Sequence, residues 1–240
     1  METIRFSTIV PTWERVASGY LQRCLSSLKN QTYPHFEAII VDDGSKEDVK
    51  SIVAQFDERF RYFRIEHSGR VIARLFGMEQ AQNDWICWLD SDDEYLSTYF
   101  QTLAWAIERW PNYKVFNFGA IVHAYEKDEA GNHVAVSYTQ IRPTFKPELN
   151  PEGPGHVHFT SGHIGTGSFI FHRSCLEEVE ILPHVINFYE LADQCGIPGY
   201  SAAKLWCGNP WGDDFVAFWR LTRKFESKPL DACLYVQHRR

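Results

Sequence analysis

Three acidic clusters stand out among the residues that could do chemistry. The first is Asp90-Ser91-Asp92-Asp93, which follows the apolar run 85–89. Because alternate residues of an extended segment point the same way, Asp90 and Asp92 can aim at one point. Hard divalent cations such as Mg²⁺ prefer carboxylate oxygens, and they need few of them where a phosphate supplies the rest. The alternative is a solvated turn that caps the next helix. The position after a buried strand favours a Mg²⁺ or Mn²⁺ site.

The second cluster is Asp42-Asp43-Gly44-Ser45, and it also follows an apolar run, residues 36–41. A carboxylate in this position can accept hydrogen bonds from a nucleobase edge or from ribose hydroxyls. The cluster also fits a turn in which Gly44 has a positive φ and Ser45 caps a helix. The two roles are compatible.

The third cluster is Asp213-Asp214, directly before an amphipathic segment. A carboxylate at a helix start is often a cap that interacts with the helix dipole, which explains one of the two. The other is a candidate general base, because that role needs a single positioned carboxylate within reach of a substrate hydroxyl.

Basic residues are concentrated between positions 59 and 74. We interpret Arg59 and Arg61 as a solvated basic face. Arg70 and Arg74 lie four residues apart around a predicted helix start, where backbone N–H groups also attract anions. Arginine suits phosphate through its paired donors, so Arg74 is a candidate ligand of a phosphate group. Zinc is disfavoured for His156, His158 and His163, because no cysteine lies at ligand spacing.

The elements that must position these residues alternate between strand and helix in the first half of the chain. Apolar runs predict strands at 6–10, 36–41, 62–65 and 85–89, and helical periodicity predicts helices around 21–28, 49–56, 71–81 and 100–107. This order predicts a mainly parallel sheet flanked by helices. Such sheets bind ligands at the carboxyl ends of their strands, where residues 12–15 and the first two clusters lie.

The second half is less regular. We expect a hairpin from 115–125 and 134–138, a long loop over 142–168, a short strand at 169–171 and a closing strand at 233–237. Helices are expected at 174–180, 188–195 and 213–223. Without an internal repeat or a linker, the chain is predicted to be one domain of 1–240. We divide it into a regular half (1–110) and a less regular half (111–240).

Composition narrows the class of protein. The chain has 240 residues, 44% of them apolar, and a formal charge of -7, which argues against a nucleic-acid-binding protein that relies on bulk positive charge. No apolar stretch is long enough to span a bilayer, and the N-terminus lacks signal-peptide features. Six scattered cysteines are typical of reduced core thiols, so we expect a cytoplasmic protein. Motifs of dinucleotide-binding, P-loop and serine-hydrolase enzymes are missing.

Taken together, these segments resemble the family-2 inverting glycosyltransferases of GT-A fold. The resemblance is carried by residues 6–13, 25–32, 36–45, 69–77 and 85–93, and it returns at 212–220. Position 13 is Trp where the family more often has Tyr, and Leu75 replaces the family's Asn after the Ala-Arg pair. The resemblance implies a mostly parallel Rossmann-like sheet with a smaller, irregular acceptor-side region. It also implies that 1–110 is the nucleotide-sugar-binding half and 111–240 the acceptor-binding half.

The resemblance also implies roles for individual residues. Pro11 and Trp13 would line a base pocket, Asp43 would contact the base and Asp42 would support the ribose. The predicted nucleotide-sugar site comprises Pro11, Thr12, Trp13, Glu14, Asp42, Asp43, Arg70, Arg74, Asp90 and Ser91. The predicted metal ligands for Mn²⁺ or Mg²⁺ are Asp92, Asp90 and His238, and the predicted base is Asp214. Acceptor-side candidates are Thr166, Gly167, Ser168, Trp206, Trp211, Asp213 and the three histidines of 156–163.

The function implied is sugar transfer from a nucleoside-diphosphate sugar, with UDP as the default, to a hydroxyl of a glycan, a lipid-linked acceptor or another acceptor, with inversion at the anomeric carbon. Two alternatives stay open: a sugar-phosphate nucleotidyltransferase, and a non-catalytic module that binds a nucleotide or glycan. We expect a cytoplasmic protein, and peripheral association with the inner face of a membrane and homo-oligomerisation stay open.

Overall fold

The computed structural model describes residues 2–141, 166–182 and 213–239 of the chain. The first half contains β1 (Phe6–Thr12), α1 (Tyr20–Lys29), β2 (Phe36–Asp43), α2 (Val49–Val53), β3 (Phe60–Ile65), α3 (Arg70–Gln80), β4 (Trp85–Trp88), β5 (Glu94–Tyr95) and α4 (Tyr99–Arg109). The second half contains β6 (Val115–Lys127), β7 (His133–Ile141), β8 (Phe169–His172), α7 (Asp213–Lys224), β9 (Ser227–Arg239) and two 3₁₀ helices, η2 (Thr166–Ser168) and η3 (Arg173–Glu177).

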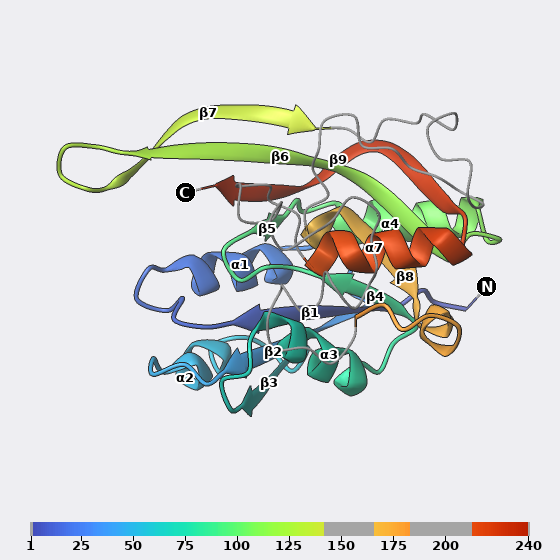
Figure 1. Cartoon of the computed structure of the whole chain (residues 1–240), viewed down its shortest axis with the longest axis horizontal. Helices are drawn as coiled ribbons and strands as arrows, with labels where there is room; N and C mark the ends of the chain where they lie inside the picture. The colour runs from blue at the N-terminus through green and yellow to red at the C-terminus, as the bar shows by residue number, and fades with distance from the viewer. Residues whose placement is uncertain (1, 142–165, 183–212, 240) are drawn as a thin grey trace, which may run out of the picture.

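The described strands form one sheet in the order β3-β2-β1-β4-β8-β6-β9-β5, with β7 paired to the outer part of β6 (Figure 1). The strands of the first half, β3, β2, β1 and β4, are all parallel, as predicted. Antiparallel pairing enters with the second half, where β8 runs against both β4 and β6. The carboxyl ends of β1, β2 and β4 therefore meet at one edge.

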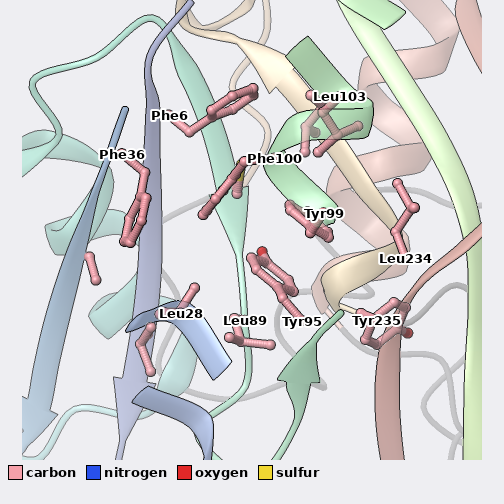
Figure 2. Close-up of a cluster of buried hydrophobic side chains, with 14 of the residues drawn as sticks. Phe6, Leu28, Phe36, Leu89, Tyr95, Tyr99, Phe100, Leu103, Leu234 and Tyr235 are labelled. Carbon is pink, nitrogen blue, oxygen red and sulfur yellow. The ribbon is translucent and has the colours of Figure 1, made fainter. Parts of the chain in front are cut away.

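Two apolar cores lie on the two faces of this sheet, because successive strand residues alternate between faces. On β2, Ala38 and Ile40 pack with α1, α2 and α4, whereas Ile39 and Val41 pack with α3 and α7. Figure 2 shows the first core, in which the Phe100 ring of α4 stacks on Phe36 with ring centroids 4.8 Å apart. Helices α3 and α7 therefore share one face, although they are more than 130 residues apart in the sequence.

Helix α3 approaches the sheet closely at Gly77. A Cβ atom added there would lie 2.5 Å from Cγ2 of Ile9 on β1 and 3.3 Å from a methyl group of Val41. Only glycine leaves room for this contact, since real side chains do not approach to that distance. The close packing fixes the height of α3, and so of its arginines, above the strand ends.

Three expectations differ from the structure. The closing strand begins at Ser227 rather than at Cys233, and β9 runs through Pro229 with an irregular register against β6. The acidic cluster is followed by an unpredicted short strand, β5, which pairs with β9. The helix expected at 174–180 is the 3₁₀ helix η3, which ends at Glu177.

The described residues contain no helix that is both long and apolar enough to cross a membrane. The helix expected at 188–195 and most of the loop expected at 142–168 lie outside the described residues, as do Trp206, Trp211 and the three histidines of 156–163.

Candidate active site

A cleft of about 390 Å³ lies at the carboxyl ends of β1, β2 and β4. The side chains and backbone that line it come from Pro11, Thr12, Trp13, Arg15, Asp43, His67, Gly69, Arg70, Asp90, Ser91 and Asp92. The structure thus brings together eight of the twelve residues predicted for nucleotide-sugar or metal binding. It leaves Glu14, Asp42, Arg74 and His238 outside the lining.

Trp13 forms an aromatic wall together with His67. The Trp13 side chain is half exposed, and its ring stacks on that of His67 with centroids 4.9 Å apart and planes inclined by 23°. The Nδ1 atom of His67 lies 3.0 Å from the backbone carbonyl oxygen of Asp43. His67 belongs to none of the motifs recognised in the sequence. Its position just after β3, whose end lies at the same sheet edge, is the signal that could have found it.

Asp43 ties the end of β2 to the start of α3. Its carboxylate accepts hydrogen bonds from the backbone N–H groups of Ser68, at 2.7 Å, and Gly69, at 3.0 Å. The side chain is almost fully buried yet forms part of the cleft lining. Asp43 can therefore shape the base pocket and hold the turn that leads into α3.

Asp42 and Glu14 do not agree with their predicted roles in donor binding. Asp42 is fully buried, and its oxygens accept from the Ser45 N–H, the Tyr62 hydroxyl and the Arg64 guanidinium. The side chain alternates to the face opposite Asp43, so it secures β3 and the turn rather than a ribose. Glu14 adopts a φ of 50° and accepts a hydrogen bond from the Lys46 N–H at 2.7 Å.

The carboxylates of Asp90 and Asp92 both line the cleft, with about a third of each side chain exposed. An Arg15 guanidinium nitrogen lies 3.7 Å from Asp92, and Arg15 is a lining residue that the motif reasoning missed. No group of three or more His, Cys, Asp or Glu side chains suited to a metal occurs in the described ranges. Two carboxylates beside a diphosphate-sized cleft nevertheless match the donor set of a hard cation that takes its other ligands from a phosphate and water.

His238 is not placed as a metal ligand. Its Nε2 atom lies 2.8 Å from an oxygen of Glu94, and its Nδ1 atom lies 2.8 Å from the Tyr125 hydroxyl. Both ring nitrogens therefore have partners on β5 and β6. The backbone N–H of His238 donates to Asp93, which explains how the end of β9 is attached to the acidic cluster.

The two cleft arginines occupy different depths. Arg70, the first residue of α3, is 57% exposed along its side chain and lines the cleft. Arg74 is fully buried, bonded to Asp90 at 2.6 Å and to Asp213, with its guanidinium 5.1 Å from the centre of the Trp88 ring. Burial acts to lower the pKa of Arg74, but Asp213 and Asp90 outweigh it and raise the pKa. The predicted contact of Arg74 with a base or diphosphate is therefore not what this structure shows.

The basic face expected at 59–61 is also wrong, because these arginines are paired. Arg59 bonds to Asp57 at 2.7 Å, and Arg61 bonds to Glu37 at 2.5 Å. The positive charges of Arg59 and Arg61 are therefore balanced by nearby carboxylates.

Asp213 and Asp214 begin α7, as predicted, but their environments differ. Asp213 is buried and paired with Arg70 and Arg74, so it anchors the arginines and is not an acceptor contact. Burial opposes ionisation of Asp213, yet Arg74 and Arg70 prevail and hold its pKa below the usual range. For Asp214, burial and then the charge of Asp213 raise the pKa to about 6. Neighbouring carboxylates with divergent pKa values are typical of a site that uses one of them as an acid or base.

Two of the acceptor-side candidates near β8, Gly167 and Ser168, are packed inside the protein. A Cβ atom on Gly167 would lie 2.7 Å from the Tyr235 ring, so the turn at η2 rests directly on β9. Ser168 is 3% exposed. Neither residue presents an open surface to an acceptor.

A mostly parallel sheet with helices on both faces, an acidic pair at one strand end and a cleft of about 390 Å³ beside it are features of the GT-A fold. The family model for glycosyl transferase family 2 matches residues 7–178, more than half of the chain. The chain therefore belongs to glycosyl transferase family 2, which confirms the resemblance seen in its motifs.

Similar proteins agree with this assignment. An uncharacterized glycosyltransferase of Rickettsia bellii is 33% identical over 91 residues, which are 37% of this chain and 13% of that protein. The GalNAc(5)-diNAcBac-PP-undecaprenol beta-1,3-glucosyltransferase of Campylobacter jejuni is 35% identical over 104 residues, which are 41% of this chain and 33% of that protein. This chain thus spans about a third or less of the length of these relatives.

The fold has solved counterparts. The crystal structure of S. aureus TarS 1-349 matches with a TM-score of 0.59 and 18% identity, over 98% of this chain and 60% of that one. The same protein in complex with UDP-GlcNAc matches with a TM-score of 0.60 and 18% identity, over 99% of this chain and 59% of that one. These likenesses confirm the predicted fold class.

Proposed function

We propose that the protein transfers a sugar from a nucleoside-diphosphate sugar to an acceptor hydroxyl, with inversion and with a divalent cation. The observation that carries the proposal is the placement of Asp214. This carboxylate begins α7 next to Asp213, which Arg74 joins to Asp90 at the cleft. A candidate base therefore stands beside a candidate donor site.

The donor is proposed to lie in the cleft, with its base against Pro11, Trp13 and Asp43. Stacking on an exposed Trp suits a flat nucleobase. Arg70, at the N-terminus of α3, suits the diphosphate because the guanidinium and the helix terminus both favour anions. UDP is the preferred nucleotide, since the structural neighbour TarS has been solved with UDP-GlcNAc and with UDP.

In the proposed reaction, Asp214 accepts the proton of the acceptor hydroxyl, and the resulting oxygen bonds to the anomeric carbon. The bond from that carbon to the diphosphate breaks at the same time, and its electron pair leaves with the nucleoside diphosphate. Displacement from the opposite face inverts the configuration. Asp90 and Asp92 would hold Mn²⁺ or Mg²⁺, which when bound neutralises charge on the leaving diphosphate. Arg70 would add a fixed positive charge there.

The acceptor is proposed to be a glycan, a lipid-linked saccharide or another hydroxyl compound. The buried free thiols of Cys24, Cys87 and Cys175 support a reducing compartment, so we propose that transfer takes place in the cytoplasm, where the inner face of a membrane is accessible.

The test combines binding with turnover. We expect UDP to raise the melting temperature more than other nucleotides do, and more with Mn²⁺ than without, because a ligand of the folded state stabilises it by mass action. Purified protein should then consume one UDP-sugar and release UDP. Asp214→Asn should abolish this turnover while UDP still binds. Full activity of Asp214→Asn would show that the base is assigned wrongly. Release of pyrophosphate from a nucleoside triphosphate would indicate nucleotidyl transfer instead.

A further inference from the structure

Arg74 is the largest charged side chain that the described structure buries completely. A buried charge is costly unless its hydrogen-bonding groups are matched by partners of opposite charge. Arg74 has such partners on two different elements: Asp90, 16 residues further along the chain, and Asp213, 139 residues further along. The Trp88 ring covers the guanidinium with a cation–π contact.

These contacts join the two sides of the proposed reaction. Asp90 follows β4 and faces the donor cleft, while Asp213 is the first residue of α7. Asp214 is attached to Asp213 by a peptide bond, so a restraint on Asp213 also limits where Asp214 can lie. The bridge Asp90–Arg74–Asp213 therefore fixes the distance between the donor side and the candidate base.

Arg70, on the same helix α3, has the exposure expected of a residue that binds the donor. Its side chain is 57% exposed, it lines the cleft, and its Nε atom lies 2.8 Å from the other oxygen of Asp213 in an ion pair. Arg74 bonds to the same carboxylate from within the protein and is not part of the cleft lining. The two arginines of α3 thus meet at Asp213 but present different surfaces to a ligand.

We propose that Arg74 is a positioning residue and not a donor ligand: its paired bonds to Asp90 and Asp213 hold the start of α7, and with it Asp214, in register with the donor site. The inference rests on the proposed function for its catalytic consequence. It requires both the charge and the planar, forked geometry of arginine, which lysine does not reproduce.

A plain structural ion pair is the alternative, and the chain offers a matched control. Arg61 on β3 bonds to the buried carboxylate of Glu37 on β2, and neither residue lines the cleft. Loss of either pair should lower stability. Only loss of the Arg74 bridge should alter the start of α7 and the reaction.

The experiment compares Arg74→Lys, Arg70→Lys and the control Arg61→Met with the wild type. Measurements are UDP affinity with Mn²⁺ by calorimetry, kcat and KM for UDP-sugar consumption, and amide hydrogen exchange over residues 213–218. For Arg74→Lys we expect UDP affinity within about threefold of wild type and kcat lower by about 10- to 100-fold, since a small misplacement of a catalytic group has effects of that order. Exchange at the start of α7 should be faster. Arg70→Lys should instead weaken UDP binding, and Arg61→Met should leave kcat and the exchange of 213–218 unchanged.

Two results would overturn the inference: a loss of UDP affinity in Arg74→Lys as large as its loss of kcat, or an unchanged kcat in a folded Arg74→Lys protein. If Arg74→Lys does not fold, Asp213→Asn removes the same bridge from its other end, and the same pattern is expected of it. If the wild type turns over no sugar nucleotide, the proposed function fails by itself. The exchange comparison between Arg74→Lys and Arg61→Met then decides whether the bridge holds α7.

Discussion

The pH dependence of sugar transfer follows from the surroundings of Asp214. Burial and then the charge of Asp213 raise its pKa to about 6. A general base acts only when it is deprotonated, so activity should increase as the pH rises through the pKa of the base. We therefore expect kcat/KM to climb through about pH 6 and to level off above it. An ordinary aspartate, with a pKa of about 3.9, would be almost fully ionised at about pH 5 and would give no such limb.

The size of the effect can be worked out from that pKa. With a pKa of about 6, the ionised fraction is about 10% at pH 5 and about 90% at pH 7, so kcat/KM should be roughly ninefold lower at the more acidic pH. The assay is the initial rate of UDP release at low donor concentration and constant Mn²⁺, across this range. UDP affinity measured at the same pH values separates protonation of the base from loss of donor binding.

The charge of Asp213 should influence the pH at which the activity rises. The Asp213 carboxylate raises the pKa of Asp214, whereas Arg74 and Arg70 lower it. Removing the negative charge of Asp213, with Asp213→Asn, should lower the pKa of Asp214 and shift the acid limb of the remaining activity to lower pH. The matched control is Asp48→Asn, which removes a carboxylate charge at the cap of α2, where Asp48 accepts from the Ser51 N–H at 3.0 Å and where asparagine can cap equally well. A limb near pH 4 in the wild type, a flat profile, or an equal shift in Asp48→Asn would refute the reasoning.

Three further predictions concern the metal, the base pocket and the packing of α3. Asp92→Asn should weaken Mn²⁺-dependent UDP binding by about 10- to 100-fold in calorimetry and leave metal-free binding nearly unchanged; equal affinity with Mn²⁺ would exclude Asp92 as a ligand. Trp13→Ala should weaken UDP binding by about 1–3 kcal/mol through lost stacking, and Trp13→Tyr should restore most of it. Gly77→Ala should lower the free energy of unfolding in urea by about 1–3 kcal/mol because of overpacking, and Ile9→Ala should cost less in the Gly77→Ala chain than in the wild type. Equal costs in the two chains would argue that the methyl group does not meet Ile9.

Local pattern was enough to predict the sheet and the edge at which the site lies. Each apolar run that ends in Asp42-Asp43 or Asp90-Ser91-Asp92 became a parallel strand with its acidic end at the cleft. The reason is physical, since strand and helix periods repeat over short distances and parallel strands place their carboxyl ends together. The irregular course of β9 through Pro229 could not be predicted from local pattern, because β9 pairs with β6, a strand more than 100 residues away.

Sequence pattern did not decide which of two adjacent or related residues would face the cleft. Alternation along a strand separates Asp42 from Asp43, but it does not tell which face of the sheet carries the site. Helical spacing likewise puts Arg70 and Arg74 on one side of α3 without saying how deeply each is buried. The packing of Gly77 against Ile9 sets that depth.

The sequence by itself therefore determined the fold class, the family motifs and the position of the acidic clusters, because each depends on residues close together in the chain. Tertiary structure alone showed that Asp42 is enclosed by β3, that His67 joins Trp13, and that Arg74 lies between Asp90 and Asp213. The contact of Arg74 with Asp213 exists only because α3 and α7 pack on the same face of the sheet. Whether such a charge pair forms depends on how deeply each side chain is buried and in which direction it points. Neither property can be predicted from the spacing of residues along the chain.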